Sequence, residues 1–191
     1  MNDRTQSADL FLDELPSDRK GSWRGQLFGN PSSGLDPVLT LALRFPWRGS
    51  VDVTIEGIPA DVPSWREIEG IEVESTESGE PVDAWVYDGA HNFFEYARIQ
   101  VLHQVGTMAR FVVDLAEGEE FFLTLPNDEI LEADQIYTTV DAEFEGIEMY
   151  LTADRELAEF TDPTGLVFDW AHGDCKFYKV VDSGNPEHSG Q

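Results

Sequence analysis

Cysteine is almost missing from this chain, whose 191 residues include Cys175 as the only example. One cysteine cannot form an internal disulfide, so the fold does not depend on a disulfide framework. The start, Met1-Asn2-Asp3-Arg4, lacks the basic region and apolar run of a secretion signal. Apolar runs are also far shorter than the ~20 residues that span a bilayer. We therefore expect a cytoplasmic protein with no membrane segment.

Sequence motifs of the common enzyme classes are missing as well. The chain has no Gly-rich phosphate loop, no His-Glu-x-x-His and no Gly-x-Ser-x-Gly. It also lacks the Asp-rich loop that binds calcium. Two carboxylates at the spacing of a glycosidase would occur by chance among 38 acidic residues. We therefore expect a protein that is not an enzyme and needs no cofactor.

Lysine and arginine are scarce, and their scarcity is uneven along the chain. Residues 1–66 hold 9 acids and 7 bases, which leaves 29 acids and 5 bases for residues 67–191. Almost all of the formal net charge of -26 therefore lies after residue 66. Such a charge repels nucleic acid and anionic lipid, and it attracts cationic partners. Direct binding of nucleic acid is therefore not expected.

Apolar and polar residues alternate along most of the chain, which is typical of half-buried strands. An aromatic content of 12% further favours a folded domain over an acidic disordered chain. The pattern predicts a mainly β fold, either an antiparallel β-sandwich or a strongly curved sheet. The expected strands are Trp23–Phe28, Val38–Phe45, Ser50–Glu56, Ile68–Glu74, Asp83–Tyr87, Phe94–Val105, Met108–Leu115, Glu120–Leu125, Gln135–Leu151, Leu166–Trp170 and Phe177–Val181.

The clearest hairpin turns at Gly106-Thr107. One apolar face on each strand is expected, formed by Ala97, Ile99, Val101 and Val105 and, opposite, by Ala109, Phe111, Val113 and Leu115. Gly146 sits where the apolar parity of the ninth strand switches, and Gly70 does the same in the fourth. Both glycines therefore predict a β-bulge, since glycine tolerates the unusual backbone angles of the extra residue.

Helix is expected to be minor, with two or three short segments at Ala8–Leu15, Asn127–Asp134 and Thr152–Phe160. The length fits one domain better than two. We expect that domain to span residues 8–182, with polar tails at 1–7 and 183–191.

Carboxylates on outward-facing strand positions suggest a binding surface. The stretches 67–88 and 114–162 are the most acidic, and Glu143, Glu145 and Glu148 should form a solvent-facing ladder that few neighbouring cations relieve. Exposed aromatics would anchor a partner at such a surface. The residues expected to bind the partner are Glu69, Glu72, Glu74, Trp85, Tyr87, Glu143, Glu145, Glu148 and Tyr150, with Trp65 and Tyr137 as further aromatic candidates.

The partner that fits this surface is a basic protein, such as a nuclease, another nucleic-acid enzyme or a toxin. Nucleic-acid enzymes have basic clefts because they bind phosphates, and carboxylates could stand where phosphate oxygens would stand. This interpretation describes an inhibitory protein of the immunity or antitoxin type. It leaves the oligomeric state open.

Three alternatives compete with it. His91, Glu95 and His103 have the donor types of a zinc or iron site, so a metal- or carbohydrate-handling β-scaffold is the first. The second is an accessory protein from a salt-adapted organism, whose fold would loosen at low ionic strength. The third is cysteine catalysis in the segment 169–175, where His172 and Cys175 lie close in sequence. Nearby acids oppose a reactive thiolate there, so a turn between strands is the better interpretation.

Overall fold

The computed structural model describes residues 17–30, 35–48, 51–76, 81–87, 91–117, 123–124, 130–131, 135–150 and 156–181. These residues are almost entirely β, which confirms the predicted fold class. The elements are β1 (Arg19–Asn30), β2 (Leu35–Arg48), β3 (Val51–Pro59), β4 (Glu72–Ser75), β5 (Asp83–Tyr87), β6 (His91–Val105), β7 (Met108–Glu117), β8 (Leu123–Thr124), β9 (Ile130–Leu131), β10 (Gln135–Tyr150), the 3-10 helix η1 (Leu157–Glu159), β11 (Leu166–His172) and β12 (Cys175–Val180). In this part of the chain, no helix has the length and apolar character that a membrane span requires.

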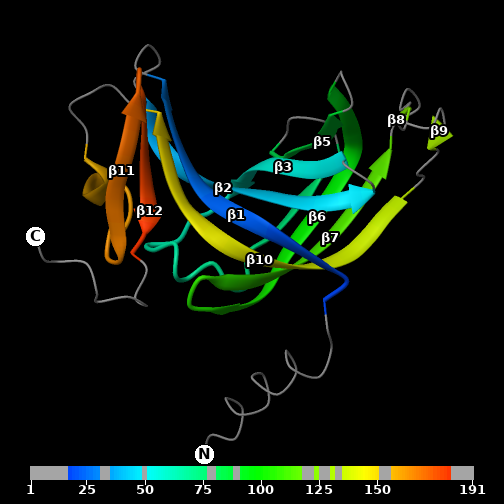
Figure 1. Ribbon diagram of the computed structural model, residues 1–191, viewed down its shortest axis with the longest axis horizontal. Helices are drawn as coiled ribbons and strands as arrows, with labels where there is room; N and C mark the ends of the chain where they lie inside the picture. Colours follow the sequence, from blue (N-terminus) through cyan, green and yellow to red (C-terminus); the bar gives the residue numbers. More distant parts are fainter. Residues whose placement is uncertain are drawn as a thin grey trace, which may run out of the picture.

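Ten of the strands form one strongly curved sheet that closes on itself. Its order is β1-β2-β3-β5-β6-β7-β10-β12-β11, and β4 pairs with β6 beside this path. The sheet closes because β10 also pairs with β1, in parallel, whereas the other pairs are antiparallel. Figure 1 shows β1 and β10 side by side along this seam, with the β11–β12 hairpin projecting beyond it. The short strands β8 and β9 form a separate pair.

The core fills the inside of the closed sheet, because alternate side chains of every long strand point inward. In β3, for example, Val51, Val53 and Ile55 are buried while the residues between them are not. The largest side chains that are fully buried include Trp23, Trp65, Phe45, Phe94 and Phe111. Among the described residues, all of the buried apolar side chains except Ala42 and Cys175 belong to one cluster. The outward-facing positions are therefore left to form the surface of the sheet.

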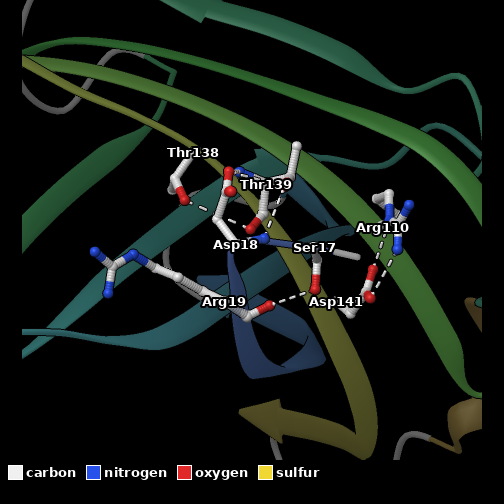
Figure 2. A network of polar contacts seen from close by, with 7 residues as sticks. All are labelled: Ser17, Asp18, Arg19, Arg110, Thr138, Thr139 and Asp141. Carbon is white, nitrogen blue, oxygen red and sulfur yellow. Dashed lines mark hydrogen bonds and ion pairs between the residues drawn. The ribbon is translucent and has the colours of Figure 1, made fainter. Parts of the chain in front are cut away.

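Polar contacts hold the residues before β1 against β10, and β10 against β7 (Figure 2). The Asp18 carboxylate accepts hydrogen bonds from the Thr139 amide and hydroxyl, both at 3.1 Å. One strand further on, Arg110 of β7 donates two hydrogen bonds to Asp141, at 2.7 and 2.8 Å. These bonds hold the pKa of Asp141 below its usual value, and hydrogen bonds from Thr139 do the same for Asp18. The Asp18–Thr139 contact helps to fix the register in which the seam closes, and the Arg110–Asp141 pair ties β10 to β7 beside it.

The predicted hairpin at Gly106-Thr107 is confirmed as β6–β7, with Val105 opposite Met108. Ala97, Ile99 and Val101 are buried as expected, but the placement of Val105 is wrong, since that side chain is 58% exposed. The reason is a bulge between Val101 and His103, which shifts the register and reverses the parity of the last residues.

The bulge at Gly146 is confirmed by a break in the β1–β10 register after Trp23 and Phe144. Gly146 has φ 148°, and a Cβ atom there would collide with the Tyr178 carbonyl and the Phe177 ring. The bulge predicted at Gly70 is wrong. Gly70 lies in a turn with φ 87°, and β4 begins only at Glu72. The turn still docks on β6, because the Gly70 amide donates to the Val101 carbonyl at 2.9 Å.

The predicted α-helices are not found in the described residues. Of Thr152–Phe160, only the single 3-10 turn η1 forms within the described residues. Ile130 and Leu131, expected in a helix over Asn127–Asp134, form the short strand β9 instead. The other residues of that segment lie outside the described residues, as do Ala8–Leu15 and the tails 1–7 and 183–191.

Candidate functional site

A hollow of about 430 Å³ lies on the outward-facing side of the sheet and crosses five strands. We call it the outer hollow. Its outward-pointing side chains come from β1, β2, β3, β5 and β10, namely Ser22, Arg24, Ala42, Arg44, Asp52, Thr54, Glu56, Trp85, Tyr87 and Glu145. Three of these, Trp85, Tyr87 and Glu145, are among the partner-binding residues expected from the sequence.

Strand register explains why distant segments meet here. Ser22 pairs with Glu143 on β10 and with Arg44 on β2. Arg44 in turn pairs with Thr54, and Thr54 with Trp85. Residues at such positions lie side by side on one face of a sheet. One row thus runs across the outer hollow from the carboxylates of β10 to the aromatic rings of β5.

Both arginines of the outer hollow are already paired. Arg44 Nη2 lies 2.6 Å from Asp52 Oδ2, and Arg24 Nη1 lies 3.1 Å from Glu148 Oε1. Arg24 Nη2 also lies 3.8 Å from a Glu56 oxygen. The Glu148 side chain is only 12% exposed, so the expected ladder of solvent-facing, unrelieved carboxylates is wrong at this position. The cause is Arg24 on β1, which the parallel seam places beside Glu148.

The exposed carboxylates Glu143 and Glu145 differ from Glu148. No cation among the described residues forms an ion pair with either of them. Glu145 is the residue that the Gly146 bulge adds to β10, since Phe144 pairs with Trp23 and Gly146 with Arg24. The bulge thus turns an uncompensated carboxylate toward the outer hollow, whose lining holds two arginines and three acids.

Aromatic rings form one wall of the outer hollow. Trp85 packs edge-on against His91 with ring centroids 4.5 Å apart, and Tyr87 lies 5.2 Å from the same ring. Phe93 lies 6.0 Å from His91 and pairs with Trp85 across the strands. Tyr87 and Phe93 are 56% and 45% exposed, respectively. Because Val82, Ala84 and Val86 fill the inward parity of β5, these rings face the solvent.

Tyr150 lies further along β10, outside the lining of the outer hollow. Its ring stacks on Phe28 of β1 with centroids 4.9 Å apart. Burial, the neighbouring Cys175 thiol and the charge of Glu148 raise the pKa of Tyr150 to about 12. The hydroxyl therefore stays protonated at neutral pH, and its ring extends the apolar part of the outer surface.

The acids predicted near β4 do not join this site. Glu69 accepts hydrogen bonds from the Gln104 amide at 3.0 Å and lies 2.9 Å from His103 Nδ1. Glu72 pairs with Arg98, and Glu74 lies opposite the same arginine in the β4–β6 register. Glu69 and Glu72 therefore tie this segment to β6.

Comparison of the chain with family models, with curated proteins and with solved structures finds no match. Function is therefore inferred from the geometry of this chain.

The candidate metal ligands do not converge. His91 and His103 lie near opposite ends of β6, twelve positions or roughly 40 Å apart at the rise of a strand. His103 contacts Glu69, whereas His91 packs among aromatic rings. No group of three or more His, Cys, Asp or Glu side chains within the described ranges has the geometry to hold a metal ion.

The segment 169–175 forms a turn between strands, as the sequence favoured. Cys175 is buried opposite His172, and Gly173 takes a positive φ of 58° in the two-residue turn. Asp169 pairs with Lys179 at 2.8 Å. Of the further aromatic candidates, Trp65 belongs to the core and stacks on Phe144, whereas Tyr137 is 71% exposed.

Sequence reasoning missed Arg24, Arg44, Asp52, Thr54 and Glu56 as parts of the site. Their outward parity is visible in the sequence. They lie beside Glu145 because β1 and β10 pair in parallel and close the sheet. Local sequence patterns do not predict a pair between strands so far apart in the chain.

Proposed function

We propose that this protein binds a basic partner protein, and that the outer hollow receives a cationic side chain of the partner. The observation that carries this proposal is the position of Glu145. It lies in the outer hollow with Trp85 and Tyr87, and no described cation pairs with it.

An arginine or lysine of the partner would pair with the Glu145 carboxylate on β10, and a second cation of the partner would lie over the aromatic wall on β5, four strand spacings or roughly 19 Å away. A cation over an aromatic face gains about 0.5–2 kcal/mol, depending on how far it is desolvated. Arg24 and Arg44 do not repel it strongly, because carboxylates already neutralise both. The net charge of -26 would speed the encounter by steering a basic surface toward this one.

The partner class that best suits this chemistry is an enzyme or toxin with a phosphate-binding cleft. Such a cleft is lined with cations, so an acidic surface can occupy it and exclude the nucleic acid. In this form the protein acts as an inhibitor of the immunity or antitoxin type. An inhibitory function of this kind depends on the residues of the binding surface and cannot be inferred from the fold.

A titration with a short fluorescent peptide containing arginine tests the hollow directly. We expect Glu145→Lys and Trp85→Ala each to weaken binding about tenfold, which corresponds to a loss of ~1.4 kcal/mol. Glu67→Lys is the matched control, since Glu67 is exposed and lies outside the outer hollow. Equal losses in Glu145→Lys and Glu67→Lys would mean that the peptide responds to overall charge, which contradicts the proposal.

Carbohydrate binding is the second candidate, because His91 lies in a cluster of exposed rings. Sugars stack on such rings and donate hydroxyl hydrogens to carboxylates. A glycan-array screen in which Tyr87→Ala abolishes a specific signal would favour it over the basic partner.

A further inference from the structure

The strand β11 ends the sheet and is exposed on both of its faces. Among the described residues it pairs only with β12. Six of its seven residues are exposed, and they include Val167, Phe168 and Trp170. Natural sheets usually protect such an edge with lysine, proline or a covering loop. β11 has neither lysine nor proline. Its protection is limited to a bulge between Phe168 and Trp170 and to one formal charge, Asp169, which is paired with Lys179 at 2.8 Å.

The apolar surface of β11 continues onto the neighbouring strands. Trp170 stacks on Phe177 of β12 with ring centroids 5.7 Å apart. In the next row, His172 lies opposite Cys175, Cys175 opposite Tyr150, and Tyr150 against Phe28. Phe28 and Trp170 are 53% and 42% exposed. An apolar patch that crosses several strands of a sheet marks an interaction surface.

The charge of this region separates it from the rest of the acidic part of the chain, residues 67–191. Residues 166–181 hold two acids, Asp169 and Asp174, and two lysines, Lys176 and Lys179, so their formal charge is zero. The whole chain carries -26. A basic partner is attracted to the carboxylates elsewhere and gains nothing from a neutral patch. A second copy of this chain is repelled by the acidic surfaces of residues 67–165, whereas this neutral, apolar patch does not repel it.

We propose that β11 is a self-association surface, on which a second copy pairs its own β11 in antiparallel orientation about a two-fold axis. Such an interface uses the same patch on both copies. The free main-chain groups of the two edges then hydrogen-bond to each other, as in other cases of strand addition. The β11–β12 hairpin projects from the closed sheet, so it would hold the acidic surfaces of the two copies apart. The aromatic patches of the two copies would then form one continuous surface across the interface.

Sedimentation equilibrium over a range of protein and salt concentrations tests this proposal. We expect a monomer–dimer equilibrium that shifts toward the dimer as salt rises, because salt screens the repulsion between the acidic bodies. Val167→Lys should raise the dissociation constant at least tenfold. Val105→Lys is the matched control, since Val105 is similarly exposed at the β6–β7 turn, and it should leave the constant unchanged.

A monomer under all conditions, an open series of larger species, or equal effects of the two lysine variants would overturn the proposal. Should Val167→Lys fail to fold, amide exchange on the unmodified chain provides the test. Protection of β11 must then rise with protein concentration, while protection of β4 stays constant. Binding of the arginine peptide weakens with salt, whereas the dimer strengthens. Failure of one proposal is therefore distinguishable from failure of the other.

Discussion

The bidentate pair of Arg110 and Asp141, which joins β7 to β10 beside the seam, is the polar contact on which the stability of the fold should depend most. The two side chains are only 10% and 27% exposed, so solvent screens them little. We expect Asp141→Asn to cost about 2 kcal/mol, the usual contribution of hydrogen bonds to a charged group. In a domain of this size that is a fall of about 5 °C in the melting temperature, measurable by calorimetry. Asp52→Asn is the control and should change little, because the Arg44 partner is 66% exposed.

The same pair sets a dependence on pH. The pKa of Asp141 is lowered in the folded state by its hydrogen bonds with Arg110. A depressed carboxylate stabilises the fold above its unfolded pKa of about 3.9, and the contribution is lost as pH falls through the folded pKa. The difference in melting temperature between the wild type and Asp141→Asn should therefore be full at pH 6 and shrink below pH 4. A difference as large at pH 2 as at pH 6 would contradict this assignment.

Gly146 is the second residue on which the fold depends. Its φ of 148° belongs to a region that only glycine occupies readily, and a Cβ would meet the Tyr178 carbonyl. Gly146→Ala should destabilise the protein by about 3 kcal/mol or more in a denaturant titration. Gly173→Ala also replaces a glycine with positive φ, but a Cβ there meets nothing within 4 Å. It should cost only about 1–2 kcal/mol, and equal losses would show that steric collision at Gly146 is unimportant.

At the scale of elements, alternation along the chain predicted most of the strands. Each expected strand overlaps an observed one, and β5 has the predicted bounds. Local pattern suffices there because one face of each strand packs on the core. The alternation pattern gave the wrong result at Val105 and Gly70. A bulge before Val105 and a turn at Gly70 change which side chains point inward. The pattern also could not show the parallel β1–β10 pair, because pairing between distant strands leaves no local mark. The outer hollow depends on that pair, so only its Trp85, Tyr87 and Glu145 were predicted.

The closure of the sheet has a measurable consequence for its strands. β10 is paired with β1 over residues 140–150 on one side, and with β7 over 135–143 and β12 over 146–150 on the other, so it has neighbours on both sides along most of its length. β4 pairs only with β6. We expect the amides of β10 to exchange among the slowest in the protein and those of β4 several orders of magnitude faster. Comparable rates in hydrogen-exchange mass spectrometry would indicate that the β1–β10 seam opens in solution.

For the whole molecule, the central question is whether the acidity serves binding or adaptation to salt. One large core and the shielded Arg110–Asp141 pair support the fold at low as well as at high ionic strength. We therefore expect a cooperative thermal transition at low ionic strength, with a melting temperature only a few degrees below that at 0.15 M salt. A chain that is unfolded at low ionic strength would instead favour the protein of a salt-adapted organism.

The most direct test of the proposed function is capture of partners from the source lysate at low and at high salt. The wild type, Glu145→Lys and Glu67→Lys would serve as baits, and bound proteins would be identified by mass spectrometry. We predict one basic protein that is retained at low salt by the wild type and by Glu67→Lys, released at high salt, and lost from Glu145→Lys. Capture that is insensitive to salt, or equal for Glu145→Lys and the wild type, would contradict binding through the outer hollow.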